Sequence, residues 1–423
     1  MMFRWPCTFE GSIRLPDLLS ALDLSKARAL ELIRPLLDDE PSDELAINRF
    51  ASVCWSSLLE PGDKIARRLI NRMTPTIALA EVSRCIEESD LKPVQKLAAK
   101  VDLEPDSLLI SLERWRLRFS PKTFRTNFET LARLGARVIA DDQVNWPNGF
   151  SLLGEAEPVV LYLLGNGSPA LFERSVAIVG SRVISPYGRW VTKEFCETLV
   201  AELRPVVSGG ALGVDSVAHQ TTLNASGDTI AIMAGGFDFM YPRGNEPLFA
   251  EIRKTGLICT EMATGFSPTK WRFLQRNRLI AAASQATVVV EAGYRSGSIS
   301  TANHAAAIGR PVGAVPGPIG ASHSAGCHRI IRENNAALLG SNENLRSLVN
   351  PELEALPAKQ ELSDEQLRVF DALGSRSSTE QRIAVRAGVG IRECQLVLAQ
   401  LEIEGLVARN ADKWRRIGRN LRG

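Results

Sequence analysis

The stretch VAIVGSRVISPYGRW, from Val176 to Trp190, is the most informative part of the sequence for the architecture of this chain. It begins with four apolar residues, as a buried strand does, passes through Gly180, and continues into a segment with the pattern of a helix. A strand, a glycine and a helix in this order open a dinucleotide-binding α/β fold. The GxGxxG fingerprint of such folds is incomplete, however, because Arg182 stands where the second glycine would be. We therefore ask what else this strand end holds.

The same pattern continues toward the C-terminus in short apolar runs, separated mostly by helix-like segments. These runs are PVVSGG, TIAIMAGG, LICTEM, ATVVVEA and PVGAVPG, and two earlier ones, ARVIA and PVVLYLLG, precede the opening stretch. Alternation of buried strands with helices is typical of a parallel sheet with helices on both faces. The expected fold class is α/β, with an extended Rossmann-like, doubly wound parallel sheet to which the two earlier runs add strands.

Regions of different character flank this core. Residues 1–125 carry leucines at helical spacings and are divided by prolines, which predicts an N-terminal helical region with a SAM-like part at about 49–125. Residues 1–48 have no assigned role. The core is expected over 126–345 and a polar, proline-containing linker over 346–361. Three short helices and two strands over 362–423 predict a winged helix-turn-helix domain, with Gly388 in the turn between its second and third helices.

Composition and charge restrict the class of protein. The 50 Lys and Arg against 48 Asp and Glu give a net charge of +2, so any contact with nucleic acid must be local. No apolar run approaches the roughly 20 residues of a membrane span, and the seven cysteines are scattered without a CxxC pair, which favours a cytoplasmic protein with free thiols. Cys327, His328 and His323 lie close in sequence, but neighbouring side chains rarely converge on one ion. Neither a metal nor a cofactor is expected.

Three strand ends combine glycines with hydroxyl groups. In an open parallel sheet, ligands lie beyond the carboxyl ends of the strands, where helix N-termini present free N–H groups. Each turn alone is typical of a tight turn with a serine cap, but three at equivalent places favour anion binding, because glycines admit an oxyanion closely and hydroxyls donate to it. The candidate residues are Gly180, Ser181, Arg182, Ser185, Gly209, Gly210, Ser296, Gly297, Ser298 and Thr301.

Two features indicate which anion binds: the absence of two nucleotide-binding motifs and the presence of a basic segment. Neither GxGxxG nor GxxxxGK[ST] occurs, so neither a dinucleotide nor ATP hydrolysis is expected. The segment SPTKWRFLQRNRLIAAAS, residues 267–284, contains four basic residues around two aromatic ones and no acid. Cations that follow a phosphate backbone and rings that stack on bases suit single-stranded nucleic acid.

A structural interpretation of the same segment stays open beside this one. Its aromatic rings can belong to the core, and its arginines can pair with Glu261 and Glu291. Both interpretations hold together if Phe273 or Arg278 is structural while Lys270 and Arg276 face outward.

An ordered series of motifs over about 170–335 resembles the DNA-processing protein A family, also called DprA or Smf. The motifs are VAIVGSRVISPYG, SGGALGVDSVAH, GDTIAIMAGGFDFMYPRGN, FLQRNRLIAAAS, VVVEAGYRSGSISTANHAA, GRPVGAVPGP and SAGCHRII. The resemblance implies a cytoplasmic protein that is not an enzyme and binds single-stranded DNA. It also implies a homodimer formed through the Rossmann-like core, which helps RecA replace single-strand-binding protein on DNA in natural transformation, that is competence, or in recombination.

The resemblance also implies roles for individual residues. Arg182 would meet a phosphate, while Lys270 and Phe273 would supply a phosphate contact and a ring for a base. Three further residues match the family's RNR motif, and at least one of them would hold the shape of the pocket: Arg276, Asn277 and Arg278.

This sequence departs from the family pattern at three positions. Leu212 replaces a basic residue of the second loop, Leu274 replaces a proline, and His328 replaces an asparagine. The first departure predicts that one phosphate contact is lost or moved.

Two other classes of function compete with this one. Related nucleotide-binding or nucleotide-cleaving enzymes carry a GGxGT loop and a catalytic glutamate, but this chain has SGSIST, and residues 298–309 contain no acid for acid–base catalysis. A winged-helix transcription regulator needs a recognition helix that fits a negatively charged groove, but residues 391–406 carry one arginine against three glutamates. For this domain we favour an interaction with protein.

Overall fold

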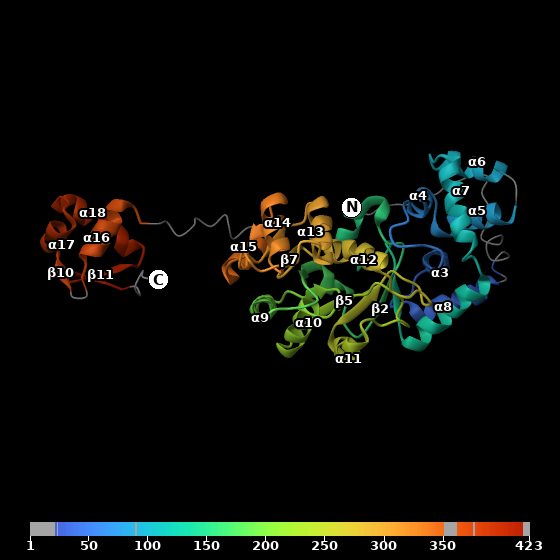
Figure 1. Ribbon diagram of the computed structural model, residues 1–423, viewed down its shortest axis with the longest axis horizontal. Helices are drawn as coiled ribbons and strands as arrows, with labels where there is room; N and C mark the ends of the chain where they lie inside the picture. The colour runs from blue at the N-terminus through green and yellow to red at the C-terminus, as the bar shows by residue number, and fades with distance from the viewer. Residues whose placement is uncertain (1–21, 23, 89–90, 351–361, 375–376, 418–423) are drawn as a thin grey trace. The chain divides into compact units, whose positions relative to one another are not determined.

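The computed structural model describes residues 22, 24–88, 91–350, 362–374 and 377–417. The chain forms two compact units, Met1–Pro351 and Glu352–Gly423 (Figure 1). Residues 1–21, which are part of the extension that has no assigned role, and residues 351–361 of the expected linker lie outside the described residues. The division of the chain into four segments stays a prediction, and its boundary at residue 125 falls within helix α8 (Pro121–Leu134).

A nine-stranded sheet forms the centre of the first unit, in the order β1-β2-β6-β5-β4-β3-β7-β8-β9. Seven strands, from β6 to β9 across the sheet, run parallel, and β1 and β2 pair antiparallel at one edge. The α/β fold class with two added strands is therefore confirmed. The strand bounds are β1 Arg137–Ile139, β2 Leu161–Leu164, β3 Val176–Val179, β4 Val206–Ser208, β5 Thr229–Ile232, β6 Leu257–Thr260, β7 Ala286–Val289, β8 Val312–Ala314 and β9 Ala337–Leu338.

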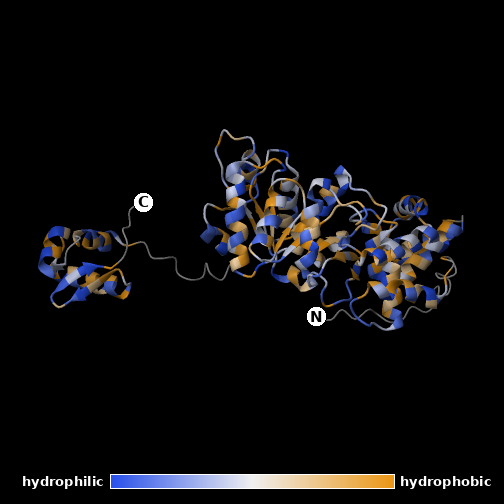
Figure 2. Ribbon diagram, turned by 90° about the horizontal axis from the view of Figure 1, so that it is seen from below, coloured by the Kyte–Doolittle hydropathy of each residue, from blue (hydrophilic) through white to orange (hydrophobic). Residues whose placement is uncertain are grey.

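Helices cover both faces of this sheet (Figure 1), because successive residues of each buried strand point to opposite sides. Ala177 and Val179 of β3 pack toward α12, α13 and α14, whereas Val176 and Ile178 pack toward α9, α10 and α15. Figure 2 shows the strands as an apolar layer between helices with hydrophilic outer faces. The helix bounds are α9 Pro186–Ala201, α10 Val214–Asn224, α11 Glu246–Thr255, α12 Lys270–Ala283, α13 Gly297–Ala307, α14 Ala325–Glu333 and α15 Asn342–Val349.

The N-terminal helices share one core with the β1–β2 edge of the sheet. Trp55 and Trp115 meet edge to face, and the Tyr162 hydroxyl of β2 hydrogen-bonds to Ser56. Prolines occupy the first turn of α5, α7 and α8, where their missing N–H costs nothing. The helix bounds are α2 Lys26–Ile33, α3 Asp43–Ser56, α4 Lys64–Arg72, α5 Pro75–Glu87, α6 Leu91–Lys100 and α7 Pro105–Arg116, with 3-10 turns η1 Arg34–Leu36, η2 Asn148–Ala156, η3 Pro169–Arg174 and η4 Arg243–Asn245.

The second unit is a winged helix, as the sequence predicted. Gly388 ends its second helix in the left-handed conformation, with φ of +65°, which a glycine adopts without strain. A two-residue strand before that helix pairs with the wing and was not foreseen from the sequence. The elements are α16 Asp364–Ala372, β10 Ser378–Thr379, α17 Glu380–Ala387, α18 Ile391–Ile403, β11 Val407–Asn410 and β12 Lys413–Arg416.

None of the helices among the described residues is long and apolar enough to cross a membrane.

Candidate nucleic-acid interface

The chain reverses its direction across the sheet between β3 and β7. From β3 the next strands are added on one side as β4, β5 and β6, whereas β7, β8 and β9 are added on the other. Such a switch point opens a crevice at the carboxyl ends of the two central strands, where ligands of this fold class bind. The loops that carry most of the candidate residues follow β3, β4 and β7, so they meet at this edge.

The first loop, after β3, is fixed to the start of α10. Val214 N–H donates to the Ser181 carbonyl at 3.1 Å, and Gly213 lies against the backbone of Ser181 and Arg182 with φ of +89°. A side chain at residue 213 would collide with that backbone, so a glycine is required there. The loop therefore holds Arg182 in a defined place while its side chain stays exposed.

A cluster of rings and guanidinium groups lies beside this loop. The guanidinium of Arg182 lies over the Phe273 ring, 5.2 Å from its centroid, and the Tyr241 ring lies 5.6 Å from the same centroid. Phe273 is half-buried, Tyr241 is 46% exposed, and Lys270 is exposed three residues before Phe273 on α12. The structure thus brings Arg182, Lys270 and Phe273 to one surface, as expected, and adds Tyr241.

Arg276 is buried rather than facing outward, so that part of the sequence prediction is wrong. Its guanidinium donates to the carbonyl oxygens of Gly209 and Ile232 at the ends of β4 and β5, and lies 5.7 Å from the Phe273 centroid. Burial lowers the pKa of Arg276 to about 10, and the nearby Asp215 carboxylate opposes this shift. The side chain stays charged at neutral pH. Its guanidinium also packs against the Phe273 ring.

The second loop, after β4, uses its N–H groups internally. The N–H groups of Gly209 and Ala211 donate to one carboxylate oxygen of Asp215, at 3.2 and 3.3 Å. A side chain at Gly209 would lie 2.5 Å from Arg276, and one at Gly210 would lie 2.8 Å from the Phe249 ring. Packing inside the protein accounts for these glycines, and their contact with DNA stays a prediction.

The third loop, after β7, is organised by the buried carboxylate of Glu291. This carboxylate accepts hydrogen bonds from the N–H and the hydroxyl of Ser185, so the expected pairing of Glu291 with an arginine does not occur among the described residues. Ser185 also caps α9, and its hydroxyl is therefore not free for a phosphate. Ser296 caps α13, while Ser298 and Thr301 are 8% and 1% exposed.

Arg278 and Asn277 of the RNR motif hold the backbone around the crevice in place through side-chain hydrogen bonds. Arg278 forms two hydrogen bonds of 2.6 Å with Glu261 and donates to the Ala156 carbonyl, which confirms the expected pairing of an arginine with Glu261. The Asn277 side chain donates to the Gly297 carbonyl at 3.1 Å. Asn277 therefore ties α12, which carries Phe273, to the first turn of α13.

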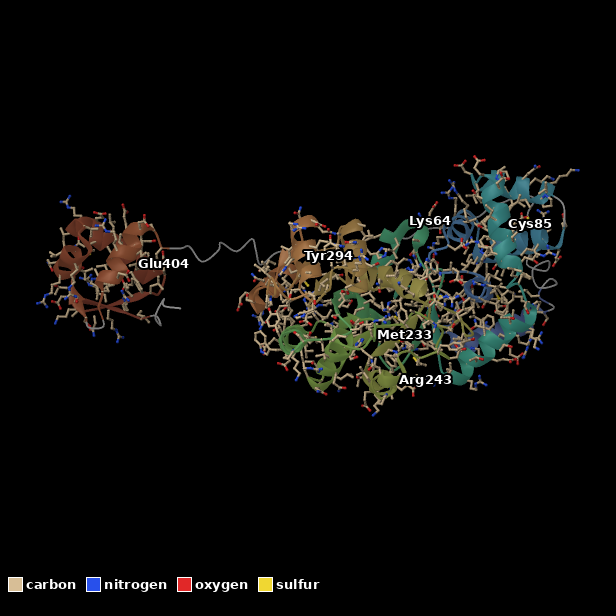
Figure 3. The ribbon with its side chains drawn as sticks, viewed as in Figure 1. Lys64, Cys85, Met233, Arg243, Tyr294 and Glu404 are labelled. Carbon is tan, nitrogen blue, oxygen red and sulfur yellow. The ribbon has the colours of Figure 1, made fainter. Side chains whose placement is uncertain are left out.

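Sequence analysis missed Tyr241 and Arg243. Both are exposed and follow β5, and Figure 3 shows Arg243 beside α11. Asn245 anchors this segment by donating to the carbonyls of Gly210 and Ala211 in the second loop. The signal was present in the motif GDTIAIMAGGFDFMYPRGN, where an aromatic residue and an arginine follow a strand end.

Residues 137–350 match the model of the family described as DNA recombination-mediator protein A. The chain belongs to this family. Residues 354–413 match the DprA winged helix domain.

Individual members of the DprA family are similar to this chain. A DprA relative from Mycobacterium tuberculosis is 38% identical over 310 residues, which cover 68% of this chain and 79% of the relative. The X-ray structure of DNA processing protein A from Streptococcus pneumoniae is 28% identical, with a TM-score of 0.56, and covers 71% of this chain and 97% of that one. DNA processing protein A from Helicobacter pylori, whose structure concerns its single-stranded DNA binding mode, is 30% identical, with a TM-score of 0.46 and coverage of 52% and 96%.

Removing Arg278 should destabilise the fold of this DprA family member. Arg278→Ala leaves the carboxylate of Glu261, whose side chain is only 9% exposed, without its partner, and losing one partner of a buried ion pair costs about 3–5 kcal/mol. Urea unfolding measures this change in the free energy of unfolding. The double variant Arg278→Ala/Glu261→Leu should recover part of the loss. A cost of less than about 1 kcal/mol for Arg278→Ala would contradict a structural role.

His219 of α10 should make the fold sensitive to acid. It is fully buried, and burial lowers its pKa from 6.5 to about 3. Between these values the unfolded chain binds a proton that the folded chain does not, so stability falls as the pH drops below 6.5. From pH 7 to pH 5, the wild type should lose about 2 kcal/mol more than His219→Gln. Urea unfolding at pH 7 and pH 5 measures the free energy of unfolding of both proteins. If wild type and His219→Gln lose the same amount between these pH values, His219 is not the source of the acid sensitivity.

Proposed function

We propose that this protein binds single-stranded DNA across the strand ends around β3 and β7, and that it acts as a recombination mediator. One observation carries the proposal: the exposed Arg182 guanidinium lies on Phe273, and Tyr241 lies beside the same ring. Stacking on an aromatic ring requires a base that is not already stacked in a duplex, and the cation meets the adjoining phosphate. The family description as a recombination mediator supports the second part.

Exposed cations around the rings give the strand a path. Arg243 follows Tyr241 by two residues, and Lys270 precedes Phe273 by three. Neither cation makes an ion pair within the described residues. Leu212, which replaces a basic residue of the family pattern, is 51% exposed and approaches the backbone next to Arg243. Arg243 is therefore well placed to supply the cation that residue 212 lacks.

We further propose that the protein works in the cytoplasm, without catalysis, as a homodimer that helps load RecA onto DNA in natural transformation or recombination. The carboxylates of Asp215, Glu261 and Glu291 are engaged by internal partners, which supports a binding role over acid–base chemistry. RecA loading and the dimer rest on the family resemblance.

The winged helix suits a contact with protein better than one with duplex DNA. Leu396 and Ile403 of α18 are 69% and 88% exposed, and they share this helix with glutamates. An apolar, acidic surface is a poor partner for a phosphate backbone. We therefore propose that α18 contacts a protein partner.

Fluorescence anisotropy with a labelled oligonucleotide and its duplex, over a series of salt concentrations, tests the DNA site. Phe273→Ala should weaken single-strand binding by roughly 5- to 150-fold, as expected for loss of one stacked base. Arg182→Ala should weaken it and reduce the dependence of log affinity on log salt by about 0.7. Arg133→Ala, which removes an exposed arginine of α8, is the control.

The result that would overturn the site is unchanged affinity in both variants, with melting temperatures like the wild type. A preference for duplex over single strand would favour the regulator instead. If the site holds, RecA assembly on oligonucleotide covered with single-strand-binding protein tests the mediator role. Wild type should accelerate assembly and Arg182→Ala should not.

A further inference from the structure

A depression of about 420 Å³ lies on the other side of the crevice, between the loop after β7, α13 and α14. Its volume falls in the range of roughly 300–1,000 Å³ typical of ligand sites. Tyr294, Arg295 and Ser296 form one wall, and Arg329 of α14 forms another. Figure 3 shows Tyr294 beside α13 and α14.

Tyr294 presents an aromatic ring that is already held in place. The Arg329 guanidinium lies over this ring, 4.8 Å from its centroid, and also donates to the Tyr294 carbonyl at 3.1 Å. Tyr294 is nevertheless 57% exposed, so the face opposite Arg329 is open to a ligand. A ring fixed before binding loses little entropy when a flat group stacks on it. The same pair of groups, a guanidinium over a ring, occurs in Arg182 and Phe273.

The charge of the depression indicates an anionic ligand. Arg295 is exposed and makes no hydrogen bond or ion pair within the part of the chain that the structure describes. Arg329 has one acidic neighbour, Glu333, at 3.6 Å, and this carboxylate is shared with Arg332. A flat ring with an unpaired guanidinium beside it suits a base joined to a phosphate, that is, a nucleotide.

The depression is connected to the first site through the framework already described. The loops that hold Arg182 and Tyr294 follow β3 and β7, which are neighbours in the sheet. Asn277 links α12, the helix of Phe273, to Gly297, three residues after Tyr294. A strand that leaves Phe273 along the first turn of α13 therefore reaches Tyr294 over fixed backbone.

We propose that this depression is a second nucleotide subsite. It holds a base on Tyr294 and the adjoining phosphate on Arg295, from the same DNA strand that occupies the first site. This inference rests on the proposed function, because it assigns a further part of the strand to this protein. It predicts that affinity depends on Tyr294 only when the strand is long enough to reach both rings.

Oligothymidylates of about 4 to about 16 nucleotides test this dependence on length in the full-length protein. Tyr294→Ala should bind the longest strand roughly 5- to 150-fold more weakly than wild type and the shortest strand equally well. Tyr294→Phe, which keeps the ring, should behave as wild type at every length. Trp190→Ala removes a similarly exposed ring, 59% exposed on α9, and serves as the matched control.

The outcomes separate this inference from the proposed function. If Tyr294→Ala binds long strands like wild type while Arg182→Ala does not, the second subsite is wrong and the first stands. If neither substitution matters, the proposed DNA site fails as well. An equal loss at every length would also overturn a separate subsite. Free thymidine monophosphate that binds through Tyr294 without competing with long strands would show a nucleotide site unrelated to the strand.

Discussion

The buried charge of Arg276 organises the strand ends on which everything else depends. Its guanidinium joins the ends of β4 and β5 by donating to two backbone carbonyl oxygens, those of Gly209 and Ile232. A buried charge is tolerated only if its hydrogen bonds are made and its charge is compensated. The two carbonyl oxygens supply the hydrogen bonds, and the nearby Asp215 carboxylate stabilises the positive charge. Burial raises the pKa of Asp215, and Arg276 together with the loop N–H groups opposes that rise. Asp215 thereby holds the second loop in place, and Arg276 packs against the Phe273 ring.

This arrangement separates the residues that hold the crevice from those that face outward. The former are buried and fully engaged, as Arg276 and Arg278 are, while Arg182 and Lys270 are exposed on the same edge. Basic residues close together in one sequence segment thus have opposite roles. The distinction arises from the position of α12, because the last two turns of this helix are buried in the core while its first turn lies at the surface.

The sequence alone predicted the fold and part of the site. Alternating apolar runs and helices were sufficient for the parallel sheet, and the resemblance to the DprA family implied that Arg182 and Phe273 belong to one site. The prediction that Arg276 faces outward was wrong, because the spacing of residues along one helix does not show that backbone carbonyl oxygens at the ends of β4 and β5 lie within reach of its guanidinium. The contact of the Ser185 hydroxyl with Glu291 was not foreseen either, because Glu291 lies 106 residues later in the chain. Tyr241 was missed because its ring has a role only once Phe273 lies beside it.

The ion pairs of Glu60 have a consequence for any shortened form of this protein. Glu60 accepts from both Arg118 and Arg272, and although burial favours its neutral form, these two arginines lower its pKa. Arg272 is the neighbour of Phe273 on α12, so the helical region neutralises a cation next to the stacking ring. A core fragment that begins at residue 137 would lack Glu60 and carry that positive charge uncompensated. Beside Phe273, the attraction of that fragment for a phosphate would then exceed that of the intact chain.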